Sequence, residues 1–252
     1  MKQIIYAATA LLLGVTACKK NDVTAIDFEL VSGAQVKFGY WVARQINVPV
    51  QIKLDNQRVS NNLTYAISFP GGGANQGGSN TNDYLSVGIG TKAVSLAFNN
   101  IGTSNDSVVL YTGNINFEQG KRYSVMFTDS ASVKAAVLLD DFASVTPPNN
   151  TTAVCRFFHG LLNTGNVDVY YGSSTTPVFT NVAYNTASST YALIPIGSSV
   201  IAIRPAGSLP TAPVLATFSA AIAGGRVYTA VARGIVGVTG TRAPLISVVT
   251  NR

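Results

Sequence analysis

The sequence predicts an all-β fold made of two β-sandwich domains in tandem. Three observations lead to this prediction. Short runs rich in Val, Ile, Thr, Tyr and Phe alternate with turn residues such as Gly, Asn, Ser and Pro. These runs recur at strand-like spacing without helical periodicity. The pattern of the first half of the chain then returns in the second half, which indicates two copies of one domain.

The chain begins with an apolar segment typical of an export signal. Lys2 supplies a positive charge, and residues 4–15 form an apolar run of about a dozen residues. A bilayer-spanning helix needs roughly 20 apolar residues, so this run is too short to be one. The following Val15-Thr16-Ala17-Cys18 resembles the lipobox of bacterial lipoproteins. The resemblance implies that residues 1–17 are a cleaved signal peptide and that Cys18 is lipidated. The alternative is an ordinary secretory signal that contains a cysteine.

Residues 18–35 are predicted to be a lipidated tether. Each buried CH₂ of an acyl chain contributes about 0.8 kcal/mol, so several chains on Cys18 would hold the protein firmly on a membrane. Lys19-Lys20-Asn21-Asp22 is similar to the signal that exports lipoproteins to the cell surface in Bacteroidetes-type bacteria. We therefore expect the protein to be lipid-anchored at the outer membrane. The sequence leaves open whether it lies on the cell surface or on the periplasmic face.

The first domain is predicted to span residues 36–141. A Gly-rich segment, Gly71 to Gly78, suits no regular element and is expected to be a long loop. Because loops carry function on β-sandwiches, this loop is one candidate contact surface. The strand candidates are residues 36–42, 48–54, 65–69, 84–87, 93–98, 108–111, 123–127 and 135–139.

A linker at residues 142–152, stiffened by two prolines, leads to a second domain at 153–252. The second domain repeats the first in five segments of the same order. The repeated segments are 156–159 on 37–40, 167–170 on 50–53, 191–203 on 84–96, 225–231 on 120–126, and Leu245-Ile246 opposite Val137-Leu138.

The best-defined repeat motifs also point to a family. Arg156-Phe157-Phe158-His159, Val167-Asp168-Val169-Tyr170, the segment 191–197 and the Gly-Arg-x-Tyr-Thr strand at 225–229 resemble the DUF4397 family. The first copy departs from the family pattern, with Gln51 in place of Asp and Tyr40 in place of His. The resemblance implies Ig-like sandwiches in a secreted or lipid-anchored bacterial protein. It implies no established activity and no catalytic residue.

Charge is unevenly distributed along the chain. The whole sequence carries a net charge of +6. Residues 19–141 are neutral overall, whereas residues 142–252 hold six arginines and a single acid, Asp168. This excess suggests either mild attraction to anionic glycans or lipid headgroups, or simply dispersed arginines at turns and strand edges. No stripe of basic residues interleaved with aromatics is present, so nucleic-acid binding is not expected.

The sequence holds no recognisable catalytic constellation, and we expect no enzyme. His159 is the only histidine, which excludes metal sites built on a histidine pair. No serine lies in a Gly-x-Ser-x-Gly motif. We expect His159 to be a structural residue on a strand, hydrogen-bonded near Asp168. A polysaccharide-processing site between the domains is the enzymatic alternative.

No cofactor and no metal site is predicted. Asp140-Asp141 could contribute to a Ca²⁺ site, but Ca²⁺ takes six to eight oxygens and no Asp-x-Asp-x-Asp loop accompanies them. These carboxylates are instead expected to be solvated at the end of a strand. With Cys18 lipidated, Cys155 has no disulfide partner and is expected to be a small buried residue.

Three aromatic residues are candidate ligand contacts. Trp41 and the pair Tyr170-Tyr171 could stack on sugar rings, and strand alternation places one tyrosine of the pair outside. The sequence thus favours a non-enzymatic envelope lipoprotein that binds or scaffolds a glycan or a protein partner. The alternative is an accessory subunit of an outer-membrane assembly. Ligand, domain arrangement and oligomeric state stay open.

Overall fold

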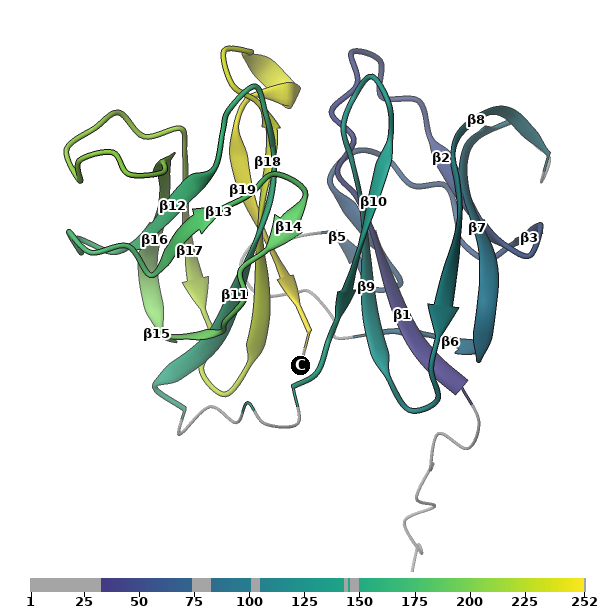
Figure 1. The fold of residues 1–252 in the computed structure, drawn as a ribbon, viewed down its shortest axis with the longest axis horizontal. Helices are drawn as coiled ribbons and strands as arrows, with labels where there is room; N and C mark the ends of the chain where they lie inside the picture. Colours follow the sequence, from purple (N-terminus) through teal and green to yellow (C-terminus); the bar gives the residue numbers. More distant parts are fainter. Residues whose placement is uncertain (1–32, 74–82, 101–104, 143–144, 146–149, 252) are drawn as a thin grey trace, which may run out of the picture. The chain divides into compact units, whose positions relative to one another are not determined.

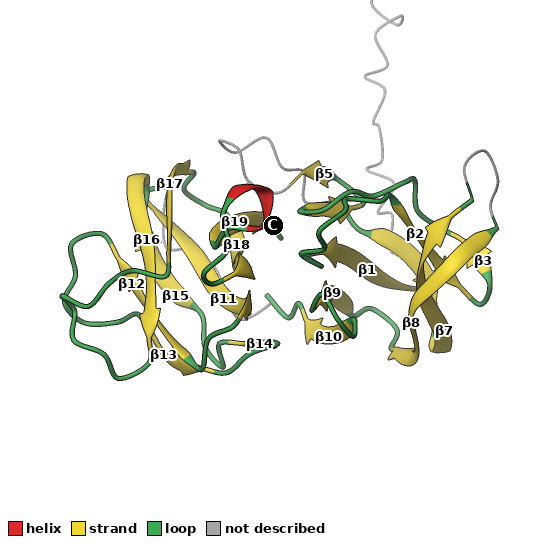
Figure 2. Ribbon diagram, turned by 90° about the horizontal axis from the view of Figure 1, so that it is seen from above, coloured by secondary structure: helices red, strands yellow, loops and turns green. Residues whose placement is uncertain are grey.

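The computed structural model describes residues 33–73, 83–100, 105–142, 145 and 150–251 (Figure 1). The predicted signal peptide and Cys18 lie outside the described residues, as does nearly all of the tether. Most of the Gly-rich loop, from residue 74, and most of the predicted linker also lie outside them. The regular elements of the described chain are all strands except for one short 3₁₀ helix at Gly240–Arg242, and loops connect them (Figure 2). The all-β prediction is confirmed.

The first sandwich consists of two sheets, named here A and B. Sheet A has the order β10-β9-β1-β4-β5, with β6 also paired to β1, and sheet B has the order β3-β2-β7-β8. The strands are β1 (Gly33–Tyr40), β2 (Val50–Leu54), β3 (Gln57–Arg58), β4 (Ile67–Phe69), β5 (Gly72–Gly73), β6 (Leu85–Gly88), β7 (Gly90–Asn99), β8 (Asp106–Phe117), β9 (Arg122–Thr128) and β10 (Lys134–Leu139).

The second sandwich consists of sheets C and D. Sheet C has the order β14-β11-β18-β19, with β15 also paired to β11, and sheet D has the order β13-β12-β16-β17. The strands are β11 (Thr152–Leu162), β12 (Val167–Tyr171), β13 (Phe179–Val182), β14 (Thr186–Ala187), β15 (Ala192–Pro195), β16 (Gly197–Pro205), β17 (Ala216–Ile222), β18 (Val227–Ile235) and β19 (Leu245–Thr250).

The two halves share one topology, down to the register of their central strands. In each half the first strand pairs in parallel with a later strand, β1 with β9 and β11 with β18. Lys37 lies opposite Ser124 in the first pair, and Arg156 lies opposite Thr229 in the second. This agreement supports the alignment of Lys37 with Arg156 that the sequence predicts.

The last segment of the predicted repeat is wrong by three residues. Val137 pairs with Val125, and Val248 pairs with Ala230, which is the residue equivalent to Val125. The counterpart of Val137 is therefore Val248, not Leu245. The sequence pattern could not set this register, because β19 is buried on both faces from its second residue onward and its apolar residues do not alternate.

Each sandwich has its own core between its two sheets. On β1, the alternate residues Val36, Phe38 and Tyr40 belong to the core of the first sandwich. The intervening Lys37 is also buried, at 2% exposure, on the opposite face of sheet A. A strand that is buried on both faces must have a second layer packed against it.

That second layer is sheet C of the other half. A third apolar cluster combines Trp41, Met126 and Ala136 from the first half with Phe158, Val231 and Val249 from the second. Hydrogen bonds cross the same boundary, including one from Thr128 Oγ1 to Asn185 Oδ1 at 2.7 Å. Sheets A and C therefore bury their outer faces against each other, which settles the domain contact that the sequence left open.

The structure places no helix in the described residues that is long and apolar enough to span a membrane.

Candidate functional site

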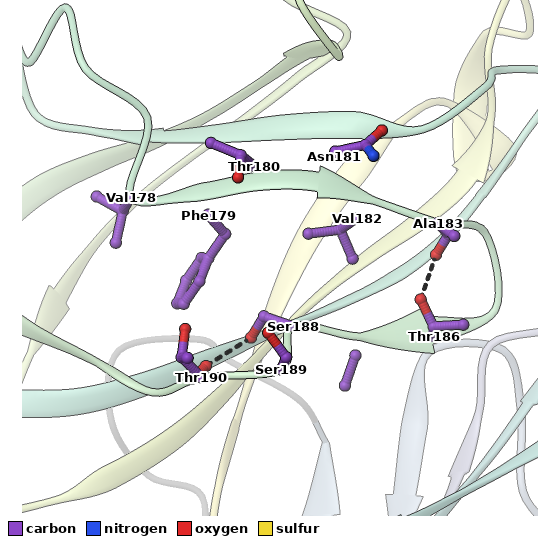
Figure 3. A pocket seen from close by; sticks show the side chains of 11 residues that line it. Val178, Phe179, Thr180, Asn181, Val182, Ala183, Thr186, Ser188, Ser189 and Thr190 are labelled. Atoms are coloured by element: carbon purple, nitrogen blue, oxygen red, sulfur yellow. Dashed lines mark hydrogen bonds between the residues drawn. The ribbon is translucent and has the colours of Figure 1, made fainter.

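A groove of about 300 Å³ lies within an arch formed by residues 178–190 (Figure 3). One limb is β13, the terminal strand of sheet D, and the other is β14, the terminal strand of sheet C. Residues 183–185 carry the chain from one sheet to the other. The groove is thus built from one continuous segment that connects an edge of sheet D to an edge of sheet C.

Local chemistry fixes the arch. Thr186 donates to Ala183 O twice, from its backbone N at 3.3 Å and from its hydroxyl at 2.7 Å. Asn185 has a positive φ of 59° and donates its N–H to His159 O. Asparagine tolerates this backbone conformation better than most residues. Phe157 N donates to Ser188 Oγ at 3.1 Å, which holds the second limb against β11.

The groove is polar at its rim and apolar at its floor. Phe179 and Val182 form buried parts of the lining, at 6% and 5% exposure. Thr180, Ser189 and Thr190 are exposed and present hydroxyl groups (Figure 3). None of the eleven lining residues carries a charge. Such a lining suits an uncharged ligand that has both hydrogen-bonding groups and an apolar face.

The edge of β13 is poorly shaped for pairing with another strand. Its register against β12 shifts between Val167 and Val169, which marks an irregularity in the ladder. Asn181 has a positive φ of 52°, and its N–H already donates to Asp168 Oδ1 at 2.7 Å. Short and irregular edge strands resist the addition of a further strand. Recognition in the groove would therefore rely on side chains rather than on backbone pairing.

His159 and Asp168, which the sequence placed near each other, have separate structural partners. His159 Nε2 lies 3.0 Å from Gly165 O, and Leu161 N donates to Nδ1 at 3.2 Å. These contacts fix the neutral tautomer that carries its proton on Nε2. Asp168 accepts from Asn181 N and from Gly207 N. Each side chain therefore holds nearby backbone groups in place. The described contacts include no hydrogen bond between His159 and Asp168.

The three aromatic candidates do not form an open stacking surface. Trp41 is 1% exposed and donates its indole N–H to the Met126 sulfur at 3.1 Å. Tyr170 is 3% exposed, with the Arg204 guanidinium 4.8 Å from its ring centroid. Tyr171 is half-buried and donates its hydroxyl to Pro195 O. Trp41 and Tyr170 are therefore too buried to stack on a ligand. Tyr171 is the tyrosine of the pair that keeps exposed surface, which agrees with the predicted alternation.

Asp140 corrects the expectation of two solvated acids. It is 3% exposed and forms an ion pair with Arg156, while Asp141 is exposed. The pair forms because sheet C brings Arg156 against the end of β10. Within the described residues no group of three or more His, Cys, Asp or Glu side chains could hold a metal ion. The Asp140 carboxylate is thus paired with Arg156 instead of being solvated.

Cys155 is buried at 2% exposure, as the sequence predicts. Burial raises the pKa of its thiol to about 12. Several arginines of the basic second half are also engaged within the protein. Arg233 donates to Ser247 Oγ at 2.6 Å, and Arg204 donates to Ala212 O at 3.0 Å. The positive charge of this half is thus partly committed to structural contacts.

A family model described as a domain of unknown function, DUF4397, matches residues 46–170 and 153–250. The chain belongs to the DUF4397 family. The resemblance seen in the sequence motifs is confirmed, and the two DUF4397 matches accord with two copies of the domain. The matches overlap over residues 153–170, which include nearly all of β11 and β12, so the first DUF4397 match runs across the predicted linker. A comparison with curated proteins finds no match.

The groove is the feature that sequence reasoning missed. Its residues Thr180, Thr186, Ser188, Ser189 and Thr190 are the residue types of turns and strand edges. No spacing rule distinguishes such residues from those of an ordinary loop. To predict the groove from the sequence, one would have to know that residues 178–190 connect the edges of two different sheets.

Proposed function

We propose that this DUF4397 protein is a non-enzymatic, lipid-anchored binding protein of the cell envelope, whose groove at residues 178–190 holds an uncharged carbohydrate. The observation that carries the proposal is the lining of the groove. It combines exposed hydroxyls with an apolar floor and holds no charged group. Sugars present hydroxyl groups at their edges and C–H groups on their faces, so they match both parts of this lining.

The location rests on the N-terminal sequence. The apolar run ending in Val15-Thr16-Ala17-Cys18 supports lipid attachment, and the tether that follows would keep the sandwiches off the membrane. A volume of about 300 Å³ is at the lower end of ligand sites, which are roughly 300–1,000 Å³. The groove would therefore accept one or two sugar rings of a longer chain.

A binding role without catalysis agrees with the side chains that surround the groove. A glycosidase ordinarily needs two carboxylates on either side of the scissile bond. No Asp or Glu lines the groove. His159, which lies behind the arch, is held by Gly165 and Leu161 and has no exposed surface to reach a substrate.

Calorimetric titration of the detergent-solubilised chain with neutral oligosaccharides tests the proposal. Thr180→Val and Ser189→Ala each remove one exposed hydroxyl from the rim. Loss of one hydrogen bond costs about 0.5–1.5 kcal/mol, so each variant should weaken binding by roughly 2- to 12-fold. Thr217→Val is the matched control, because Thr217 is exposed on β17 and lies outside the groove.

Two outcomes would contradict the proposal. The first is that no neutral oligosaccharide binds, whereas a purified envelope protein does, which would favour the accessory-subunit alternative. The second is that a sugar binds but Thr180→Val, Ser189→Ala and Thr217→Val all retain the same affinity. That result would place the binding surface elsewhere on the molecule.

A further inference from the structure

A cluster of polar side chains is sealed between sheets A and C, where β10 and β19 end. Asp140 follows β10 and Asn251 follows β19, and they are equivalent, since their N–H groups donate to the equivalent carbonyls of Arg122 and Val227. The Lys37 side chain extends from β1 into the same cluster. The three residues are 3%, 0% and 2% exposed, respectively. An amine, a carboxamide and a carboxylate are thus enclosed together away from solvent.

The hydrogen bonds fix the orientation of the Asn251 amide. Arg156 Nε donates to Thr229 Oγ1 at 3.0 Å, so the single hydroxyl proton of Thr229 is available to Asn251 Oδ1, 2.7 Å away. At the other end of the amide, Nδ2 donates to Tyr84 OH at 3.1 Å and faces Asp140 Oδ2 at 3.4 Å. The amide oxygen therefore faces a donor supported by a guanidinium, and the amide nitrogen faces a carboxylate.

This arrangement activates the Asn251 carbonyl carbon toward a nucleophile. A hydrogen-bond donor at Oδ1 stabilises the negative charge that develops on that oxygen when the carbon is attacked. A carboxylate beside Nδ2 can accept a proton from the attacking amine and pass it to the departing nitrogen. Thr229 and Asp140 occupy these two positions. An ordinary buried amide need not have a hydroxyl donor at its oxygen or a carboxylate at its nitrogen.

Lys37 supplies an amine at the peptide carbonyl that precedes Asn251. Its Nζ donates to the carbonyl oxygen of Thr250, the residue before Asn251, at 2.7 Å. It also lies 4.8 Å from the centroid of the Tyr84 ring, whose hydroxyl accepts from Asn251 Nδ2. Burial lowers the pKa of the Lys37 ammonium to about 8, against the raising effect of Asp140. Part of the population therefore carries a neutral, nucleophilic amine near neutral pH.

We propose that Lys37 and Asn251 join through an isopeptide bond between Nζ and Cγ. Nζ of the neutral amine attacks Cγ, and a tetrahedral intermediate forms with its oxygen held by Thr229. The Cγ–Nδ2 bond then breaks, and Asp140 transfers a proton from Nζ to Nδ2, which leaves as ammonia. One amine and one primary amide become one secondary amide and one ammonia. No oxidant, reductant or cofactor is needed.

The bond would link strands that are far apart in the chain. Lys37 lies on the first strand of the first half, and Asn251 follows the last strand of the second half. Cys155 is the single cysteine of the described chain, so no disulfide closes either sandwich there. The isopeptide bond would make the contact between sheets A and C covalent.

Mass spectrometry of a tryptic digest of the wild-type protein tests the proposal directly. Without the bond, trypsin releases Asn21–Lys37 and Ala243–Arg252 as separate peptides. With the bond, Lys37 is protected, and residues 21–44 appear joined to residues 243–252 at a mass one ammonia below the sum of the two. We expect this joined peptide from folded protein and not from protein kept in denaturant since synthesis. Separate peptides from folded protein after prolonged incubation would overturn the proposal.

Variants assign the roles within the cluster. Lys37→Met and Asn251→Ala should give no joined peptide. Asp140→Ala and Thr229→Val should lower the joined fraction at a fixed time in protein whose circular dichroism shows it folded. Lys134→Arg is the matched control, because Lys134 is an exposed lysine on β10 and should leave the joined fraction unchanged. Full joining in Asp140→Ala would overturn the role assigned to that carboxylate.

Discussion

Arg156 on β11 and Asp140 after β10 form an ion pair that is buried between the two halves of the molecule. The same carboxylate accepts from Ser124 Oγ at 2.6 Å and Tyr84 OH at 2.7 Å. The Arg156 guanidinium also donates to the carbonyl of Leu139 at 3.1 Å. Arg156 of the second half thus bonds to Asp140 and Leu139 of the first half, so this pair depends on the contact between the sandwiches.

Arg156→Met should destabilise the protein by about 3–5 kcal/mol, because removal of one partner leaves the other charge buried and unpaired. Urea unfolding followed by circular dichroism measures the change. Lys134→Met is the control, since Lys134 pairs with Asp129 at the surface and its side chain is 53% exposed. Loss of a surface pair should cost no more than about 1 kcal/mol. Equal decreases in unfolding free energy in Arg156→Met and Lys134→Met would show that the buried ion pair contributes no more to stability than the surface pair.

Trp41 should report on the contact between the halves, because it is the single tryptophan and lies in the cluster shared by sheets A and C. Its fluorescence should be shifted to short wavelength and poorly quenched by acrylamide. Since both halves contribute to one buried interface, fluorescence and circular dichroism should give the same unfolding midpoint in urea. A fluorescence transition that precedes the loss of strand signal would instead show that the halves separate before they unfold.

The stability of the protein should fall as the pH drops below about 6.5, the ordinary pKa of histidine. Burial lowers the pKa of His159 in the folded state, against a smaller raising effect of its hydrogen bond to Gly165. Below the ordinary value the unfolded chain binds a proton that the folded chain excludes, so the free energy of unfolding decreases. Above it both states are neutral and the contribution is constant. Urea unfolding from pH 5 to 7.5 measures the slope.

His159→Gln provides the comparison for this pH dependence. Glutamine keeps an N–H donor of similar reach but does not titrate. The difference in unfolding free energy between the wild type and His159→Gln should therefore narrow as the pH falls from 7 to 5. A constant difference across this range would show that His159 does not control the pH response.

Cys155 should be unreactive toward thiol reagents in the folded protein and reactive in denaturant. Its side chain is buried, and burial raises the pKa of the thiol to about 12, so little thiolate is present near neutral pH. A colorimetric assay with an aromatic disulfide measures the rate. Val137→Cys is a positive control, because Val137 is 44% exposed on β10. Equal rates at positions 137 and 155 would contradict the buried placement of Cys155.

The fold was largely predictable because short strands alternate with turn residues, and because the repeat aligns without gaps over 191–203 and 84–96. The contact between the halves was not predictable in the same way. On β1, Lys37 alternates with apolar residues, which is the pattern of a strand with one face in water. Nothing in that pattern distinguishes a face covered by water from a face covered by another sheet.

The aromatic candidates show the same limit. Strand alternation gives the face on which Tyr170 lies but not what covers that face, and Arg204 comes from β16, more than thirty residues along the chain. The groove was hidden for a related reason, since its hydroxyl residues come to line one groove only through the turn between β13 and β14. Local sequence predicts elements, whereas these sites depend on which elements become neighbours.

The equivalence of Asp140 and Asn251 shows what joining two copies in one chain permits. Two separate identical subunits that met through this face would carry the same residue at both positions. Two aspartates would place carboxylates against each other where Asn251 Nδ2 now lies 3.4 Å from Asp140 Oδ2. Two asparagines would leave Arg156 without a counter-charge. Gene duplication with fusion lets one copy hold the acid and the other the amide, so the interface can be asymmetric in chemistry while the sheets that form it remain alike.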